Sequence, residues 1–188
     1  TMALVGSTMM VGTEFAIEQR GEVLGKKFEI IPIDTEGKPA VAARKVREWA
    51  DKGVKYFTTC NSSGVALAVA QVAAETESVF ITSVGADAVT NENANNYTFR
   101  WSLPTYGATR GTLIPLMEMY PEAKKFYTIT VDYVFGQSLL ENAKNVIEEY
   151  GREHVGNDMH VGGTTEYSSY LAKAVASDAD VLVLLNYG

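Results

Sequence analysis

The chain has 188 residues, of which 46% are hydrophobic and 21% are charged, and this composition suits one medium domain or two small ones with real cores. Acidic residues outnumber basic residues 23 to 16, and without a strong basic cluster the formal net charge of -7 argues against a nucleic-acid-binding surface. The single cysteine, Cys60, excludes an internal disulfide, and no apolar run approaches the roughly 20 residues of a membrane span.

Strand-like and helix-like segments alternate along the chain. The expected elements are, in chain order, a helix over 6–19, a strand within 27–36, a helix over 39–53, a strand over 54–59, a helix over 64–76, a strand over 79–83, a short strand within 97–102, a helix over 105–120, a strand over 126–131, a helix over 135–150, a helix over 167–176 and a strand over 180–185. This alternation indicates an α/β fold, with parallel sheets covered by helices on both faces.

Three local features refine this expectation. The nearly continuous apolar run "DVLVLLN" predicts a central strand that is buried on both faces. Pro115 should kink its helix or lie in the helix's first turn. His154, Asp158 and His160 are expected in a polar loop, and the spacing of the two histidines does not suit a metal site.

The alternation fails over residues 84–105, which are rich in Asn and small residues. So long an irregular segment is natural where a chain leaves one domain for another, so we place a boundary near Leu103. The expected domains are residues 1–103 and 104–188. Because the chain opens on a helix and stops just after a buried strand, we also expect it to be part of a longer polypeptide.

Small polar side chains follow two neighbouring strands. Cys60, Asn61, Ser62 and Ser63 come after the strand over 54–59, and "ITSVGADA" ends the next one. Ligands of open parallel sheets sit beyond the carboxyl ends of strands, where helix N-termini offer free N–H groups. One of the serines can cap the helix, while the other hydroxyl and the Asn61 amide can hold a carboxylate. A plain helix cap with a turn is the alternative interpretation.

Several motifs, in their order and spacing, resemble one known family. The stretch "GEVLGKKFEIIPIDTEGKPAVAARKVREWADKGVKYFTTCNSSGVALAVAQVAAE" is similar to the first lobe of extracytoplasmic solute-binding proteins of branched-chain-amino-acid-type ABC transporters. "YTFRWSLPTYGATRG" resembles the family's crossover, "VDYVFGQSL" its DYxYGxxL motif, and "GGTTEYSSYLAKAVASDADVLVLLNYG" its later segment ending in GYG. The resemblance covers nearly all of the chain.

The resemblance implies a periplasmic-binding-protein type I fold of two parallel α/β lobes joined by a hinge, with the ligand between them. It implies that the first strand and the rest of the second lobe are absent here. The implied partners are a small-molecule ligand and a membrane ABC permease, with no cofactor and a periplasmic or other extracytoplasmic location. The ligand-binding residues that it implies are Cys60, Asn61, Ser62, Ser63, Ser83, Val84, Gly85, Ala86, Trp101, Tyr133, Phe135 and Tyr187.

The resemblance leaves the ligand class open between an amino acid and an aromatic or aliphatic carboxylate. Amino-acid-binding members typically have a hydroxyl where this chain has Ala86, and the aromatic residues of the expected cleft favour a flat or apolar carboxylate. A ligand-sensing domain of a receptor or regulator is the main alternative function. A hydrolase is a further one, but GxSxG is absent, and neither histidine nor Cys60 has the partners of a catalytic site. We therefore expect no enzyme activity.

Overall fold

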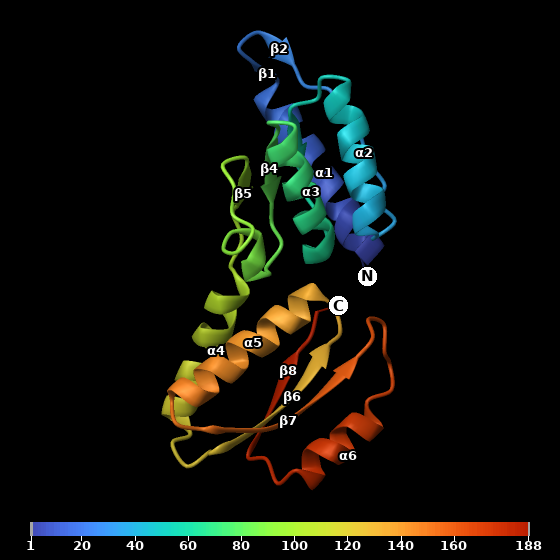
Figure 1. The fold of residues 1–188 in the computed structure, drawn as a ribbon. Coiled ribbons are helices and arrows are strands. Elements are labelled where there is room, and N and C mark those ends of the chain that lie inside the picture. The colour runs from blue at the N-terminus through green and yellow to red at the C-terminus, as the bar shows by residue number, and fades with distance from the viewer. Residues whose placement is uncertain (1, 188) are drawn as a thin grey trace. The chain divides into compact units, whose positions relative to one another are not determined.

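A computed structural model describes residues 2–187 as an alternation of helices and strands (Figure 1). The elements are α1 (Met2–Arg20), β1 (Glu22–Val23), β2 (Lys26–Lys27), α2 (Pro39–Asp51), β3 (Tyr56–Thr58), α3 (Ser63–Glu75), β4 (Val79–Thr82), the 3-10 turn η1 (Asp87–Val89), β5 (Thr98–Arg100), α4 (Thr105–Met119), β6 (Lys125–Val131), α5 (Val134–Glu149), β7 (Glu153–His160), α6 (Ser168–Ala176) and β8 (Val181–Leu185). The chain forms two compact units, the first of Thr1–Val84 and Asn93–Trp101, the second of Gly85–Glu92 and Ser102–Gly188. It therefore passes between the units three times, where the sequence suggested one boundary near Leu103.

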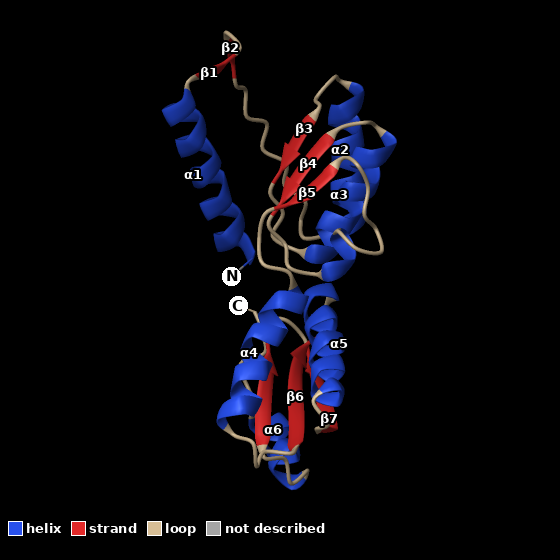
Figure 2. Cartoon of the chain, turned by 90° about the vertical axis from the view of Figure 1, so that its left-hand side faces the viewer, coloured by secondary structure: helices blue, strands red, loops and turns tan. Residues whose placement is uncertain are grey.

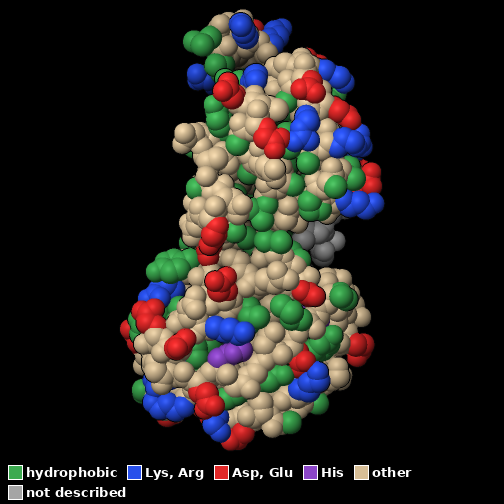
Figure 3. All heavy atoms as spheres, in the orientation of Figure 1, with side chains coloured by type: hydrophobic (Ala, Val, Ile, Leu, Met, Phe, Trp, Pro, Cys, Tyr) green, Lys and Arg blue, Asp and Glu red, His purple; other side chains and the backbone are tan. Residues whose placement is uncertain are grey.

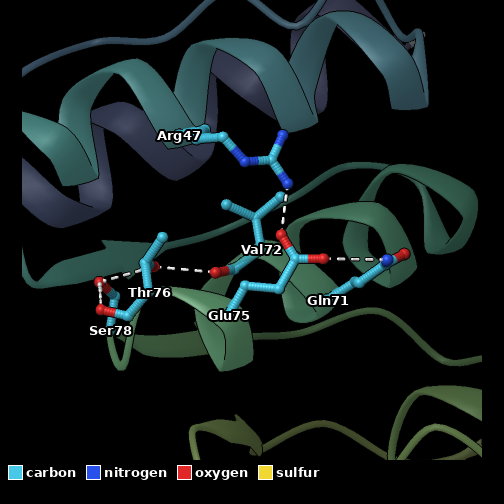
Figure 4. A network of polar contacts seen from close by, with 6 residues as sticks. All are labelled: Arg47, Gln71, Val72, Glu75, Thr76 and Ser78. Atoms are coloured by element: carbon cyan, nitrogen blue, oxygen red, sulfur yellow. Dashed lines mark hydrogen bonds and ion pairs between the residues drawn. The ribbon is translucent and has the colours of Figure 1, made fainter.

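The first unit is built on a parallel sheet of order β3-β4-β5. Helices α2 and α3 lie together on one face of this sheet (Figure 2). Helix α2 begins at Pro39, where a proline costs no hydrogen bond, and it buries Ala42, Val46 and Ala50 as its apolar spacing predicts. Phe57 and Phe80 from the strands complete this core. The outer surfaces of the two helices are joined by an ion pair from Arg47 to Glu75 (Figure 4).

The opposite face of this sheet carries exposed apolar side chains, among them Tyr56, Ile81 and Phe99. The expected strand within 27–36 is wrong: β2 ends at Lys27, and residues 28–35 form no ladder within the described chain. The pattern of β-favouring residues around Phe28 shows only that these residues have a high intrinsic preference for strand conformation. A segment becomes a strand only when a neighbour accepts and donates its backbone hydrogen bonds.

The second unit is built on a parallel sheet of order β7-β6-β8. Helices α4 and α5 cover one face, where Leu113, Phe126 and Ile147 belong to one buried cluster. Helix α6 packs on the other face, near Tyr127 and Ile129. In this unit helices cover both faces of a parallel sheet, as the sequence predicted.

Two expectations about this unit are wrong. The segment from His154 to His160 is strand β7 and not a loop. Its polar side chains are satisfied across the ladder, since Thr128 and Thr130 both donate to Asn157 Oδ1, at 2.8 and 2.7 Å. The expected central strand, β8, lies at an edge of the described sheet with Leu184 60% exposed, while β6 is the buried central strand.

Helix α4 continues through Pro115, which lies well beyond its first turn. Proline has no N–H to donate to the carbonyl of Gly111, four residues earlier. A methyl group on Gly111 would meet no atom within 4 Å, so this side of the helix is open. The helix therefore continues to Met119 with one fewer backbone hydrogen bond.

On the face shown in Figure 3, acidic and basic side chains are interspersed and form no large patch of one sign. Among residues 2–187, no helix combines the length and the apolar character that crossing a membrane requires. No group of three or more His, Cys, Asp or Glu side chains within the described part of the chain could hold a metal ion.

Candidate functional site

The carboxyl ends of β3 and β4 lie side by side in the first unit. Thr58 is paired with Ile81 in the parallel ladder, and the next N–H, that of Thr59, donates to the Ile81 carbonyl at 2.9 Å. The turn over Cys60–Ser63 therefore starts beside the strand that runs on into Ser83 and Val84. The structure brings these two predicted segments together at the carboxyl edge of the sheet, where the ligands of open parallel sheets bind.

The turn begins with a strained residue. Thr59 has a φ of 62°, in the left-handed region that β-branched residues rarely adopt. This conformation turns the chain sharply out of β3 toward the start of α3. Neither the sequence pattern nor the family motif indicated it, because a threonine in a strand-like context predicts extended backbone.

Cys60 follows directly and is partly exposed. Burial of its thiol raises the pKa to about 12, because the surrounding protein does not solvate a thiolate. At neutral pH the side chain is therefore an uncharged thiol. It can line a binding site by contact, but it has little capacity to act as a nucleophile.

Helix α3 begins at Ser63, which is 2% exposed, and Ser62 occupies the N-cap position with extended backbone. The Ser62 side chain makes no capping hydrogen bond within the described chain. The plain helix cap that the sequence left open is therefore not formed by Ser62. The first turn of α3 nevertheless presents the positive end of a helix dipole beside the Cys60–Ser63 turn. Asn61 lies at the same place, 3.9 Å from where a methyl group on Gly6 of α1 would be.

Trp101 continues from β5 at the same edge of the first sheet. Its N–H donates to the Thr82 carbonyl at 3.3 Å, and its side chain is 78% exposed. A large aromatic side chain with this exposure is available for contact with a ligand or with protein that covers it.

Three predicted aromatic residues gather at the carboxyl edge of the second sheet. Tyr133 is the N-cap residue of α5, after β6, and its ring stacks on Phe135 with a centroid distance of 6.1 Å. Phe135 in turn meets Tyr187, after β8, edge to face at 5.9 Å. Burial, with a smaller contribution from Tyr187, raises the pKa of the Tyr133 phenol, so it stays neutral as a donor. These rings form one apolar surface with two hydroxyl groups.

Gly85 and Ala86 belong to the second unit by their contacts. A methyl group on Gly85 would lie 2.6 Å from Cε2 of Phe135, so the backbone here is in direct contact with that ring. Ala86 is completely buried. Phe135 is therefore held between Tyr133, Tyr187 and the Gly85 backbone, and part of its surface is used for packing.

Two polar groups at these strand ends were not expected from the sequence. The Asp87 carboxylate accepts hydrogen bonds from Thr105 and Asn142, at 2.8 and 2.6 Å. His160, which is 5% exposed, lies at the end of β7 with its Nε2 2.8 Å from Asn186 Oδ1. A single sequence gives no signal for either pairing, because the partners lie 18 to 55 residues apart.

The predicted site residues are thus distributed over both units. The first unit carries Cys60, Asn61, Ser62, Ser63, Ser83, Val84 and Trp101, and the second carries Gly85, Ala86, Tyr133, Phe135 and Tyr187. In chemical terms, the first set offers hydroxyl groups, an amide and a helix N-terminus, which suit a carboxylate. The second set offers aromatic rings and phenol hydroxyls, which suit an apolar body with a polar group.

The family model described as "Periplasmic binding protein" matches residues 1–188. A solved amino acid ABC transporter substrate-binding protein from Pseudomonas fluorescens Pf-5 is 49% identical, with a TM-score of 0.83 over 94% of this chain and 48% of that chain. A periplasmic binding protein from Burkholderia mallei is 32% identical, with a TM-score of 0.83 over 100% of this chain and 49% of that chain. Among curated proteins, none matches this sequence.

A solute-binding protein from Rhodopseudomonas palustris BisB5, in complex with 3,4-dihydroxy benzoic acid, shares the fold at 22% identity, with a TM-score of 0.82 over 97% of this chain and 50% of that chain. The chain thus spans about half the length of these solved relatives. The expected α/β fold and the expected family resemblance are both confirmed. The family match over all 188 residues shows that the chain belongs to the periplasmic binding protein family.

Proposed function

We propose that this chain is part of an extracytoplasmic solute-binding protein of an ABC importer. Such a protein binds a small amino acid or an aromatic or aliphatic carboxylate between two lobes and presents it to a membrane permease. The observation that carries the proposal is the 49% identity to an amino acid ABC transporter substrate-binding protein over 94% of the chain. Proteins of this kind bind and release their solute without chemical change, so the function needs no catalytic residue.

In the proposed site the charged end of the solute is held by the first unit. The Cys60–Ser63 turn and Ser83 offer hydroxyl and amide groups at adjacent strand ends, next to the N-terminus of α3. A carboxylate is stabilised there by backbone N–H groups and by the helix dipole. Exclusion of water on binding would strengthen these interactions, because the effective dielectric falls.

The body of the solute is covered by aromatic residues of the second unit. Tyr133, Phe135 and Tyr187 form a continuous cluster. Flat rings accept either an aliphatic chain or another ring, and the two phenol hydroxyls can bond to a polar substituent. The same fold holds 3,4-dihydroxy benzoic acid in the Rhodopseudomonas palustris protein. The experiment below therefore includes both amino acids and aromatic carboxylates.

The test is a thermal-shift screen followed by calorimetry on the protein that carries this chain. The panel contains leucine, isoleucine, valine, benzoate and 3,4-dihydroxybenzoate. A true ligand at about 100 times its dissociation constant should stabilise the protein by about 2.7 kcal/mol. The absence of any shift across both classes would overturn the proposed ligand class.

A pair of tyrosine variants tests the proposed residues. Tyr187 and Tyr120 are 52% and 50% exposed, but Tyr120 precedes β6 at the amino end of the sheet. Tyr187→Ala should weaken binding of the ligand found in the screen, by about tenfold or more. Tyr120→Ala should leave the affinity unchanged. Equal affinities for the two variants would remove Tyr187 from the site.

A further inference from the structure

The segment from Gly85 to Glu92 is bonded to the second unit. The Gly85 carbonyl accepts a hydrogen bond from the N–H of Thr105 at 2.8 Å, and the Asp87 N–H donates to Ser138 Oγ at 3.2 Å. The contact of Phe135 with the Gly85 backbone adds a packing interaction at the same place. These partners belong to α4 and α5, so the segment is attached to two helices that are remote from it in sequence.

The Asp87 side chain provides the strongest part of this attachment. Its Oδ2 accepts from Thr105 Oγ1 at 2.8 Å, from Asn142 Nδ2 at 2.6 Å and from the Tyr106 N–H at 3.0 Å. The Tyr106 N–H also lies 3.2 Å from Oδ1. Each of these groups can donate, so the carboxylate acts as the common acceptor. It also lies at the first residues of α4, where the helix dipole favours a negative charge.

The hydroxyl groups have defined directions. Thr105 uses its single hydroxyl proton on Asp87, so the contact of 2.6 Å between Thr105 Oγ1 and Ser138 Oγ must be donated by Ser138. Ser138 Oγ in turn accepts the Asp87 N–H. The bonds thus close a ring from the Asp87 amide through Ser138 and Thr105 back to the Asp87 carboxylate. Such a ring fixes both the backbone and the side chain of one residue, and its members support one another.

We propose that Asp87 is a positioning residue that makes Gly85 and Ala86 part of the second unit. The inference rests on the proposed function in one respect, because Gly85 and Ala86 are among the proposed ligand contacts.

The first test is amide hydrogen exchange without any ligand. Asp87→Ala should speed exchange by about tenfold or more at Val89, Thr90 and Asn91, whose N–H groups bond within the segment, and at Tyr106. The amides of β6 should keep the wild-type rate. Asp132→Asn is the control, since it changes an exposed carboxylate of the same unit that is bonded to Gln137.

Unchanged exchange over the segment in Asp87→Ala would overturn the proposal. Equal acceleration at β6 would also overturn it, because Asp87 would then stabilise the whole unit and not this segment. Ser138→Ala opens the ring and leaves the charge in place, so it should produce a smaller acceleration at the same amides. If Asp87→Ala fails to fold, Ser138→Ala supplies the same comparison.

The second test measures distances between spin labels, again without ligand. Asn91 and Glu148 are exposed positions in the segment and in α5. With Cys60→Ser as background, the distance between labels at 91 and 148 should have a narrow distribution that broadens in Asp87→Ala. A wild-type distribution for 91 and 148 that is as broad as that of Asp87→Ala would refute the proposal. Neither experiment uses a solute, so a failed ligand screen would leave the proposal about Asp87 unaffected.

Discussion

Two glycines in helices, Gly136 and Gly111, should respond to substitution by alanine with opposite changes in stability. Gly136 lies in the first turn of α5, where a methyl group would be 2.0 Å from the carbonyl oxygen of Val131 and 2.8 Å from its Cγ1. Relief needs a backbone shift of more than about 1 Å, because the obstacle is main chain and cannot rotate away. Gly111 lies in α4, and a methyl group there would meet nothing within 4 Å. Neither glycine has a positive φ, so helix propensity favours alanine equally at both.

Gly136→Ala should therefore destabilise the protein by about 3 kcal/mol, at the upper end of the usual cost of overpacking. Gly111→Ala should stabilise it by about 0.5–1 kcal/mol. For a chain of this size, the expected changes in Tm are a fall of about 6–12 °C and a rise of about 1–4 °C.

The assay is thermal unfolding followed by far-UV circular dichroism, with urea unfolding at 25 °C as a check on the free energies. A Gly136→Ala protein that melts within about 2 °C of the wild type would refute the reasoning, because it would mean that α5 can move away from the end of β6 at little cost. Since Tyr133 and Phe135 flank the same turn, Gly136→Ala should also weaken solute binding, while Gly111→Ala should not.

Three further outcomes are expected. Thr59→Gly removes the cost of a left-handed β-branched residue and should raise the free energy of unfolding by about 1 kcal/mol in urea titrations; a lower value would show that the threonine side chain compensates for its backbone. Cys60 should react with iodoacetamide at pH 8 about 1,000-fold more slowly than free cysteine, because a pKa of about 12 leaves few thiolates, and alkylation at the rate of free cysteine would contradict this burial. Hydrogen bonds from Lys173 and Tyr127 hold the pKa of Asp158 below its usual value, so its contribution to stability is present above a pH of about 4 and is lost as the pH falls through the folded-state pKa. Asp158→Asn should therefore destabilise the protein at pH 7 by an amount that shrinks as the pH falls below about 4, and a difference in urea midpoint that stays constant over this fall would argue against this linkage.

The sequence predicted elements where burial follows a simple period. Helix α2 has Ala42, Val46 and Ala50 on one face, and the structure buries these three. The prediction failed where polar groups are satisfied by tertiary pairing. Strand β7 has few apolar residues, and its half-buried Asn157 accepts hydrogen bonds from the buried Thr128 and Thr130 of β6. No hydrophobic period marks a strand whose polar side chains bond to its neighbour.

The candidate site was predictable in position but not in detail. Strand ends follow from the alternation of elements, so the turn at Cys60–Ser63 and the aromatic residues after β6 and β8 could be placed at sheet edges. The bonds of Asp87 to α4 and α5 could not be predicted, because their partners lie 18 and 55 positions away. The strained φ of Thr59 was equally hidden, since local propensity favours the opposite conformation.

The three aromatic residues of the second unit differ in how firmly they are held, and this difference bears on specificity. Phe135 touches the Gly85 backbone and both tyrosines, and Tyr133 occupies the N-cap position of α5 and is partly buried. Tyr187 meets Phe135 only through a ring edge and is 52% exposed. A solute of a different shape can displace Tyr187 without disturbing a helix, whereas moving Phe135 would disturb the packing of Gly85. Substitutions at Tyr187 should therefore change which solute is preferred, while substitutions at Phe135 should reduce stability and the binding of every solute together.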